Sequence, residues 1–236
     1  MNEPARLFGV FYEPGKVFAD VADVAEKPRW GIAPILVSIL VSLALVYAIS
    51  SHIGWETTIR QTLSNNPRMA ELPAEQREKA LATGTKIASI GSWAGAVLGA
   101  PFSVLIIAGV LTGLFNGLLG TELKFATMFA ITAYALLVRA LLNALMILLI
   151  YLKPPEEFNM QVSPFSPGAY MNRLENPKWL MSLAGSLDLF TIWSVILLAI
   201  GFSVAARKLS FAKSLTAIAI PWLLWVVAMM ALQSFQ

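Results

Sequence analysis

LDLFTIWSVILLAIGF, residues 187–202, is apolar enough to cross a lipid bilayer, yet its second residue is Asp188. Similar stretches recur along the whole chain of 236 residues, which is 57% hydrophobic and only 13% charged, with a mean hydropathy of +0.69. A soluble domain of this size cannot bury so much apolar surface, so the bilayer must act as part of its solvent. The sequence therefore predicts an all-α, polytopic membrane protein.

Five apolar segments are long enough to cross a bilayer core of about 30 Å. They cover residues 30–53, 87–119, 125–152, 187–206 and 211–232, approximately, and form a predicted transmembrane domain over residues 29–236. Residues 1–28 form a polar N-terminal segment that contains PGKVFADVADVAEK, a short amphipathic helix beginning at Pro14. This helix lies either on the membrane surface or against the protein's own loops.

The basic residues of the short loops indicate the orientation in the membrane. Five spans place the termini on opposite sides, and the two tightest turns, near Lys124 and at residues 207–213, are basic. Since short loops carry most of the orientation signal, we expect a cytoplasmic N-terminus and an outside C-terminus. A net charge of +3 is too small to indicate nucleic acid as a partner. The basic residues instead suit contact with lipid headgroups.

The residues needed for common enzyme chemistry are missing from the sequence. The chain has no cysteine and a single histidine, so no transition-metal site is expected. It also has no HExxH or GxSxG motif and no phosphate-binding glycine loop. We therefore predict no catalytic residue, no metal site and no cofactor, and a protein that is not an enzyme.

Arg139 is the most informative single residue of the sequence. It lies about 21 Å along the third span, close to mid-membrane, where an unpaired charge costs several kcal/mol. Asn143 follows one helical turn later on the same face. The spacing predicts a polar stripe that faces the interior of the bundle.

Asp188 has two interpretations, which depend on where the fourth span begins. If the helix starts at Leu187, Asp188 is a capping residue at the membrane interface. If it starts near Asn176, Asp188 lies about 15 Å along the helix, at nearly the depth of Arg139. The second interpretation predicts a buried polar cluster of Arg139, Asn143 and Asp188, in which the two charges pair. Gly185 and Ser186 could interrupt the helix just before Asp188 and so favour the first interpretation.

The second span contains two glycine ladders with a spacing of four residues. The ladders consist of Gly91, Gly95 and Gly99, and of Gly109, Gly113 and Gly117. Glycines on one helix face allow another backbone to approach closely, which matters where lipid gives no hydrophobic drive between helices. The ladders predict two tight helix contacts within the chain; self-association and a mobile bend at Pro101 are the alternatives.

Three stretches of the chain resemble the YIP1 family of membrane proteins. They are LLGTELKFATMFAITAYALL (118–137), LDLFTIWSVILLAIGFSVAARKLSFAKSLTAIAIPWLL (187–224) and the entry segment YEPGKVFADVADVAEKPRW (12–30). The resemblance implies five spans and a cytosolic N-terminus. Eukaryotic members of the family associate with Rab GTPases, but this chain has no DLYGP motif, and Leu137 and Val138 stand where a proline is usual. We therefore do not transfer Rab binding, and expect a prokaryotic inner-membrane protein.

Three functions remain open at this point. The first is a membrane scaffold that binds partner membrane proteins or a second copy of itself, which the glycine ladders and the resemblance favour. The second is a lipid or small-solute transporter, or a transporter subunit, in which Arg139 and Asn143 face an anionic lipid or substrate. The third is an intramembrane enzyme, for which no nucleophile or metal set is recognisable. The first two differ in whether Arg139 is satisfied inside the protein or open to a ligand.

Overall fold

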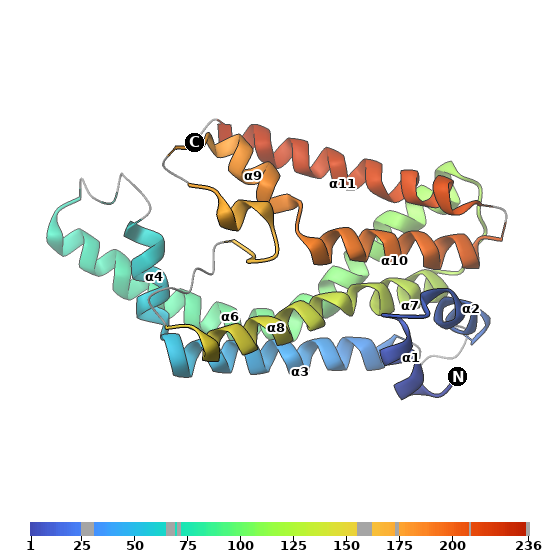
Figure 1. Cartoon of the computed structure of the whole chain (residues 1–236), viewed down its shortest axis with the longest axis horizontal. Coiled ribbons are helices and arrows are strands. Elements are labelled where there is room, and N and C mark those ends of the chain that lie inside the picture. The colour runs from blue at the N-terminus through green and yellow to red at the C-terminus, as the bar shows by residue number, and fades with distance from the viewer. Residues whose placement is uncertain are drawn as a thin grey trace. The chain divides into compact units, whose positions relative to one another are not determined.

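The computed structural model describes residues 1–24, 31–64, 69, 72–154, 162–172, 175–207 and 209–234. Within these residues the protein is helical and contains no strand (Figure 1). Four helical stretches are long and apolar enough to cross a membrane: Ile32–Ile53, Ala74–Leu118, Phe125–Leu152 and Phe211–Gln233. A bent pair, Lys178–Ser186 with Leu189–Ala205, makes a fifth span if its two helices are taken together. The predicted all-α polytopic membrane fold is confirmed.

The first, third and fifth predicted spans correspond to continuous helical stretches. α3 (Ile32–Ala48) continues into η1 (Ile49–Ile53), α7 (Phe125–Leu136) is followed closely by α8 (Val138–Leu152), and α11 covers Phe211–Ser234. The predicted boundary between residues 28 and 29, and the start of the first span at Trp30, lie outside the described residues.

The second and fourth spans differ from their predicted limits. α6 (Ala74–Thr112) begins well before residue 87, because the helix that starts after Pro73 runs into the apolar segment without a break and continues through Pro101. η2 (Gly113–Leu118) then ends this stretch. The fourth segment is divided into α9 (Lys178–Ser186) and α10 (Leu189–Ala205), which are bent by 50° at the break.

The helices form two compact units, of which the first contains residues 1–38, 101–139 and 162–236. Its N-terminal segment folds as α1 (Glu3–Gly9) and α2 (Pro14–Val24). α2 packs against α7 and α10, and α10 packs against α11. The apolar face of α2 is fully buried at Val17, Phe18 and Val21. This face is therefore covered by the helices α7 and α10, and not by the loops named in one of the two expected arrangements.

Gly201 allows α2, α7 and α10 to approach closely. A Cβ atom at this position would lie 2.4 Å from Cγ2 of Ile131 and 3.1 Å from the ring of Phe18. One residue further along α10, Phe202 stacks on Phe115 with ring centroids 4.6 Å apart. The core of the first unit is thus built from close aromatic and β-branched packing around one glycine.

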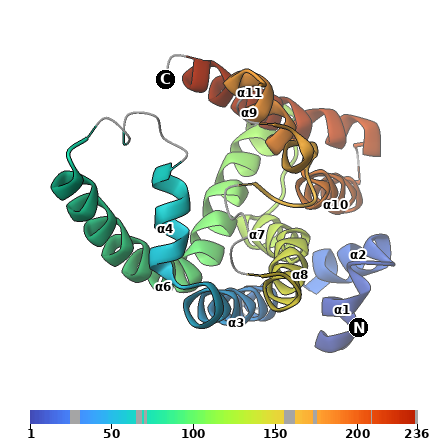
Figure 2. The same cartoon turned by 60° about the vertical axis from the view of Figure 1, so that its left-hand side comes forward.

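The second unit contains residues 39–100 and 140–161. Its core is formed by Ala48, Ile49, Ile53 and Ile150, where the end of α3 and η1 meet α8. α4 (Trp55–Ser64) approaches α6 at Gly84, where a Cβ atom would lie 3.0 Å from Cγ2 of Ile59. Figure 2 shows α4 and the first turns of α6 diverging from this crossing.

Candidate functional site

Arg139 lies in the first turn of α8, near the middle of the stretch Phe125–Leu152. Leu137 separates α7 from α8, and its backbone N–H donates to the carbonyl oxygen of Tyr134 at 3.2 Å in a tightened turn. Residues 130–138 are all buried, whereas Arg139 itself is exposed. Among the residues that the structure describes, no ion pair to Arg139 is present. The expectation that Arg139 faces the bundle interior therefore differs from its place in the structure.

Asp188 lies in the break between α9 and α10 and is the N-cap of α10. One carboxylate oxygen accepts hydrogen bonds from the backbone N–H groups of Phe190 and Thr191, at 2.9 and 3.1 Å. The other oxygen accepts a hydrogen bond from the hydroxyl of Ser163. Asp188 is only 5% exposed. Both of its carboxylate oxygens thus accept hydrogen bonds, and the structure does not bring it together with Arg139.

Asn143 belongs to the second unit, one turn beyond Arg139 in α8. Its side-chain amide donates to the hydroxyl of Ser42 in α3 at 3.1 Å. This bond connects two spanning helices through polar side chains, as is common in membrane bundles. The three residues of the predicted cluster therefore have three separate environments.

The six glycines of the two ladders present open faces of α6 and η2. Apart from the neighbouring backbone of its own helix, a Cβ atom placed on Gly91, Gly95, Gly99, Gly109, Gly113 or Gly117 would meet no atom within 4 Å among the described residues. The helix contact that the spacing predicts is not formed there by the described part of the chain.

A charged cluster that sequence reasoning missed holds α1 and α2 on the third span. Arg6 is 5% exposed and forms ion pairs with Glu3, at 3.1 Å, and with Asp20 of α2. The hydroxyl of Tyr134, a fully buried residue of α7, donates a hydrogen bond to the other carboxylate oxygen of Glu3. Burial raises the pKa of Asp20, but hydrogen bonds from the amino group of Met1 and from Arg6 outweigh burial and hold that pKa below its ordinary value.

Part of this cluster was visible in the sequence. Asn2 accepts a hydrogen bond from the backbone N–H of Ala5, and Pro4 occupies the first turn, so the start of α1 has an ordinary N-terminal signature. Glu3 and Arg6 have the spacing of a helical ion pair. The contact with Tyr134 had no local signal, because it joins residues that are 131 positions apart.

A hollow of about 330 Å³ lies where α2, the start of α7 and the end of α10 meet. Its lining includes three residues with small side chains, Ala19, Ala22 and Ala205. Four charged residues line it: Asp23, Glu122, Lys124 and Arg207. Arg207 and Asp23 form an exposed pair at 3.8 Å. No group of three or more acidic or histidine side chains among the described residues could hold a metal ion.

A family model, the Yip1 domain, matches residues 8–232, which include α2 and all but the last residue of the candidate spans. The chain belongs to the Yip1 domain family. The predicted resemblance to this family is thereby confirmed. The match extends across both compact units, so the Yip1 domain contains Arg139, the break at Asp188 and the hollow near α2.

This Yip1 domain protein is also similar to a curated bacterial protein. It is 27% identical over 205 residues to the membrane protein YknW of Bacillus subtilis (strain 168), over 85% of this chain and 78% of YknW. No solved structure matches the chain. The comparisons therefore identify a membrane protein with a relative in a bacterium.

Proposed function

We propose that this Yip1 domain protein is a non-enzymatic membrane protein that binds another membrane protein, and that Arg139 contacts an acidic group of that partner. The observation behind the proposal is the exposure of Arg139 near the middle of a span, without an ion pair among the described residues. Asp188, the internal counter-ion considered from the sequence, accepts hydrogen bonds from Ser163, Phe190 and Thr191 instead.

The energetics of the bilayer support an external counter-ion. An arginine at the centre of a transmembrane helix costs about 2.5–3.5 kcal/mol on insertion scales, and more by other measures. A carboxylate on a neighbouring helix offsets part of that cost, since two opposite charges attract strongly where the dielectric constant is low. In a symmetric dimer with its contact at Arg139, the arginines of the two copies would face each other and repel. We therefore infer that the partner at this position is a different protein.

The glycine ladders offer a second surface for association. Their six open positions allow a partner helix or a second copy to approach the backbone of α6 and η2. We place the protein in the inner membrane of a prokaryote, with the N-terminus in the cytoplasm. The basic turns at Lys124 and at residues 207–213 support this orientation.

One observation favours the alternative of a lipid or small-solute transporter. The span formed by α9 and α10 is interrupted, and a buried carboxylate, Asp188, lies at the interruption. Discontinuous helices with polar groups at the break are typical of transporter binding sites. In this alternative Arg139 and Asn143 face a water-filled path and an anionic lipid or substrate.

Cysteine accessibility separates the two functions. The chain has no cysteine, so Arg139→Cys carries a unique thiol, with Lys213→Cys as a water-exposed control and Ala144→Cys as an apolar-span control. Each variant in membrane vesicles is treated with a membrane-impermeant, anionic thiosulfonate. Partner binding predicts that Arg139→Cys and Ala144→Cys are both unreactive. Labelling of Arg139→Cys as fast as Lys213→Cys overturns partner binding and supports the transporter.

Native mass spectrometry then tests the partner directly. Wild type, Arg139→Ala, Arg139→Lys and the control Lys213→Ala are extracted gently and compared. We expect a protein that accompanies wild type, Arg139→Lys and Lys213→Ala but is lost from Arg139→Ala. Restoration of the complex by Arg139→Glu together with an acid-to-arginine change in the partner would establish the contact. An anionic lipid lost only from Arg139→Ala, with no protein, contradicts it.

A further inference from the structure

We propose that the hollow between α2, α7 and α10 binds the zwitterionic headgroup of an aminophospholipid of the phosphatidylethanolamine type. This site is independent of Arg139 and of the partner proposed above. It is made by three elements of the first unit that contact one another: α2 with α7, and α10 with both. Figure 1 shows α2 beside the start of α7 and the end of α10.

The depth of the hollow is that of lipid headgroups. Its lining includes Lys124, directly before the first residue of the span Phe125–Leu152, and Ala205, the last residue of α10. Helix ends of spanning segments lie at the boundary between the hydrocarbon core and the polar headgroups. Phe125, next to Lys124, is 44% exposed and suits contact with the upper part of an acyl chain.

The charges of the lining select a ligand that carries both signs. Lys124 and Arg207 provide cationic donors, while Asp23 and Glu122 provide carboxylate acceptors. A phosphate alone would lie near the two cations but would also lie beside two carboxylates. An amine alone would have the opposite conflict. A phosphate and an ammonium on one short headgroup satisfy both sets, through charge-assisted hydrogen bonds.

The turn that carries Glu122 and Lys124 is held in place by the side chain of Asn116. Its carbonyl oxygen accepts hydrogen bonds from the hydroxyl of Thr121, at 2.7 Å, and from the backbone N–H of Leu123, at 3.1 Å. Its amide nitrogen donates to the carbonyl oxygen of Leu123 at 2.8 Å. The charged residues of this turn therefore have a fixed backbone, which lowers the entropic cost of binding.

The space itself is created by small side chains. Three alanines on two helices line the hollow, so one larger side chain fills it without changing any charge. The ion pair of Arg207 and Asp23 is 3.8 Å long, and both side chains are largely exposed, at 87% and 71%. Such an exposed pair contributes little, so a ligand can replace it readily.

The test measures lipid binding to delipidated, detergent-solubilised protein by native mass spectrometry. The probes are phosphatidylethanolamine, phosphatidylglycerol and the water-soluble glycerophosphoethanolamine. We expect one bound phosphatidylethanolamine, held at least about fivefold more tightly than phosphatidylglycerol, which is the discrimination expected from one charge-assisted contact. Equal affinity of wild type for the two lipids overturns the proposal. Tighter binding of glycerophosphoethanolamine than of the intact lipid overturns the assignment to a membrane lipid.

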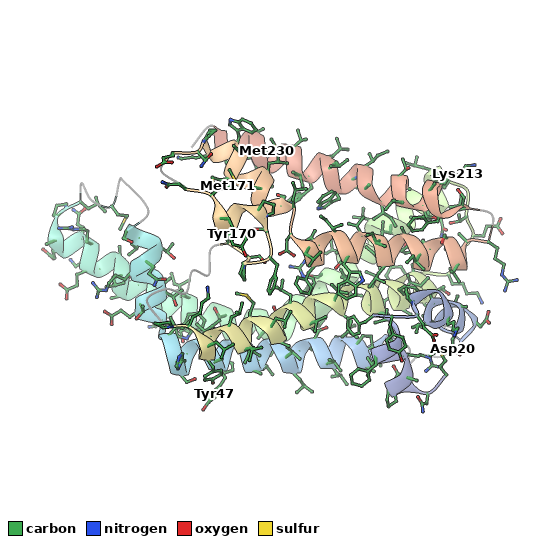
Figure 3. The ribbon with its side chains drawn as sticks, viewed as in Figure 1. Asp20, Tyr47, Tyr170, Met171, Lys213 and Met230 are labelled. Carbon is green, nitrogen blue, oxygen red and sulfur yellow. The ribbon has the colours of Figure 1, made fainter. Side chains whose placement is uncertain are left out.

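Matched variants assign the binding to this hollow. Arg207→Gln and Ala22→Leu should each weaken phosphatidylethanolamine binding about tenfold, the first by loss of a charged donor and the second by filling the space. Lys213→Gln, a nearby exposed charge in α11 (labelled in Figure 3), should leave binding unchanged.

Asp23→Asn should reduce the preference for phosphatidylethanolamine over phosphatidylglycerol. Because Arg207 and Asp23 are exposed, their variants remain folded. Identical behaviour of Arg207→Gln and Lys213→Gln would show non-specific attraction and overturn the site.

Discussion

The hydroxyl of Tyr134 in α7 donates a hydrogen bond to the carboxylate of Glu3 in α1, 131 residues earlier in the chain. Glu3 also pairs with Arg6, which pairs in turn with Asp20 of α2. A chain of polar contacts, from Tyr134 through Glu3 and Arg6 to Asp20, thereby attaches the two N-terminal helices to a spanning helix. The apolar face of α2 lies against the same bundle, so polar and apolar contacts fix the same arrangement.

Tyr134→Phe should destabilise the protein by about 1.5–3 kcal/mol, because it removes one hydrogen bond to a charged acceptor and leaves the ring in place. The measurement is the free energy of unfolding, or the melting temperature, of purified protein in detergent. Tyr47→Phe is the matched control, since Tyr47 is 62% exposed and points outward from α3 in Figure 3. Equal effects of the two changes would mean that the contact with Glu3 contributes nothing.

Asp20 should make the stability of the protein depend on acid. Its pKa is held below its ordinary value in the folded state by hydrogen bonds that outweigh burial. A carboxyl group with a lowered folded-state pKa contributes stability that is complete above its unfolded pKa, near 3.9, and is lost as the pH falls through the folded-state value. Asp20→Asn should therefore lower the melting temperature at pH 7, and the difference from wild type should shrink below pH about 4. Asp23→Asn, in the same helix, serves as the control. A difference that persists unchanged at low pH contradicts the prediction.

Gly201→Ala should cost about 1–3 kcal/mol of stability, because its methyl group would overlap Ile131 and press on Phe18. Gly109→Ala is the matched control in the same unit, since a Cβ atom there meets nothing within 4 Å. The control should be neutral or slightly stabilising, as alanine is the better helix former. Thermal unfolding of the two variants in one detergent gives the comparison. A loss at Gly109 as large as at Gly201 would instead show that a second chain already covers the ladder.

Arg139 and Asp188 should behave as independent sites in a double-mutant cycle. Asp188→Ala removes the N-cap of α10 and the acceptor of Ser163, at a cost of about 0.5–2 kcal/mol. Arg139→Ala should leave the stability of the isolated protein unchanged or raise it. The double variant should be additive within about 0.5 kcal/mol. A coupling energy above about 1 kcal/mol would restore the direct pair that one interpretation of the sequence predicted.

Asp188→Asn provides a further comparison within the same site. An asparagine oxygen can still accept from the backbone N–H groups of Phe190 and Thr191, because asparagine is as good an N-cap as aspartate. We expect it to retain most of the stability lost in Asp188→Ala. An equal loss in both variants would show that the negative charge, rather than the cap, is what the fold requires.

The sequence by itself determined the class of fold and the approximate position of the apolar stretches, but not the early start of α6 or the division of the fourth span. Hydropathy is additive along the chain, so apolar stretches such as 211–232 can be located without any knowledge of their neighbours. The N-cap role of Asp188 was also available locally, since an aspartate followed by an apolar helical segment is a common helix start. The family could be identified from the pattern of such segments.

Only the tertiary structure decided which polar groups meet. Inside a membrane no hydrophobic effect drives helices together, so close packing and polar contacts between distant segments select the helix faces. That selection places Ser163 rather than Arg139 against Asp188, connects Tyr134 to Glu3, and leaves Arg139 exposed. The hollow near α2 depends on small and charged residues from three separate elements. These residues are close together only in the folded structure, so no short stretch of the sequence could predict the hollow.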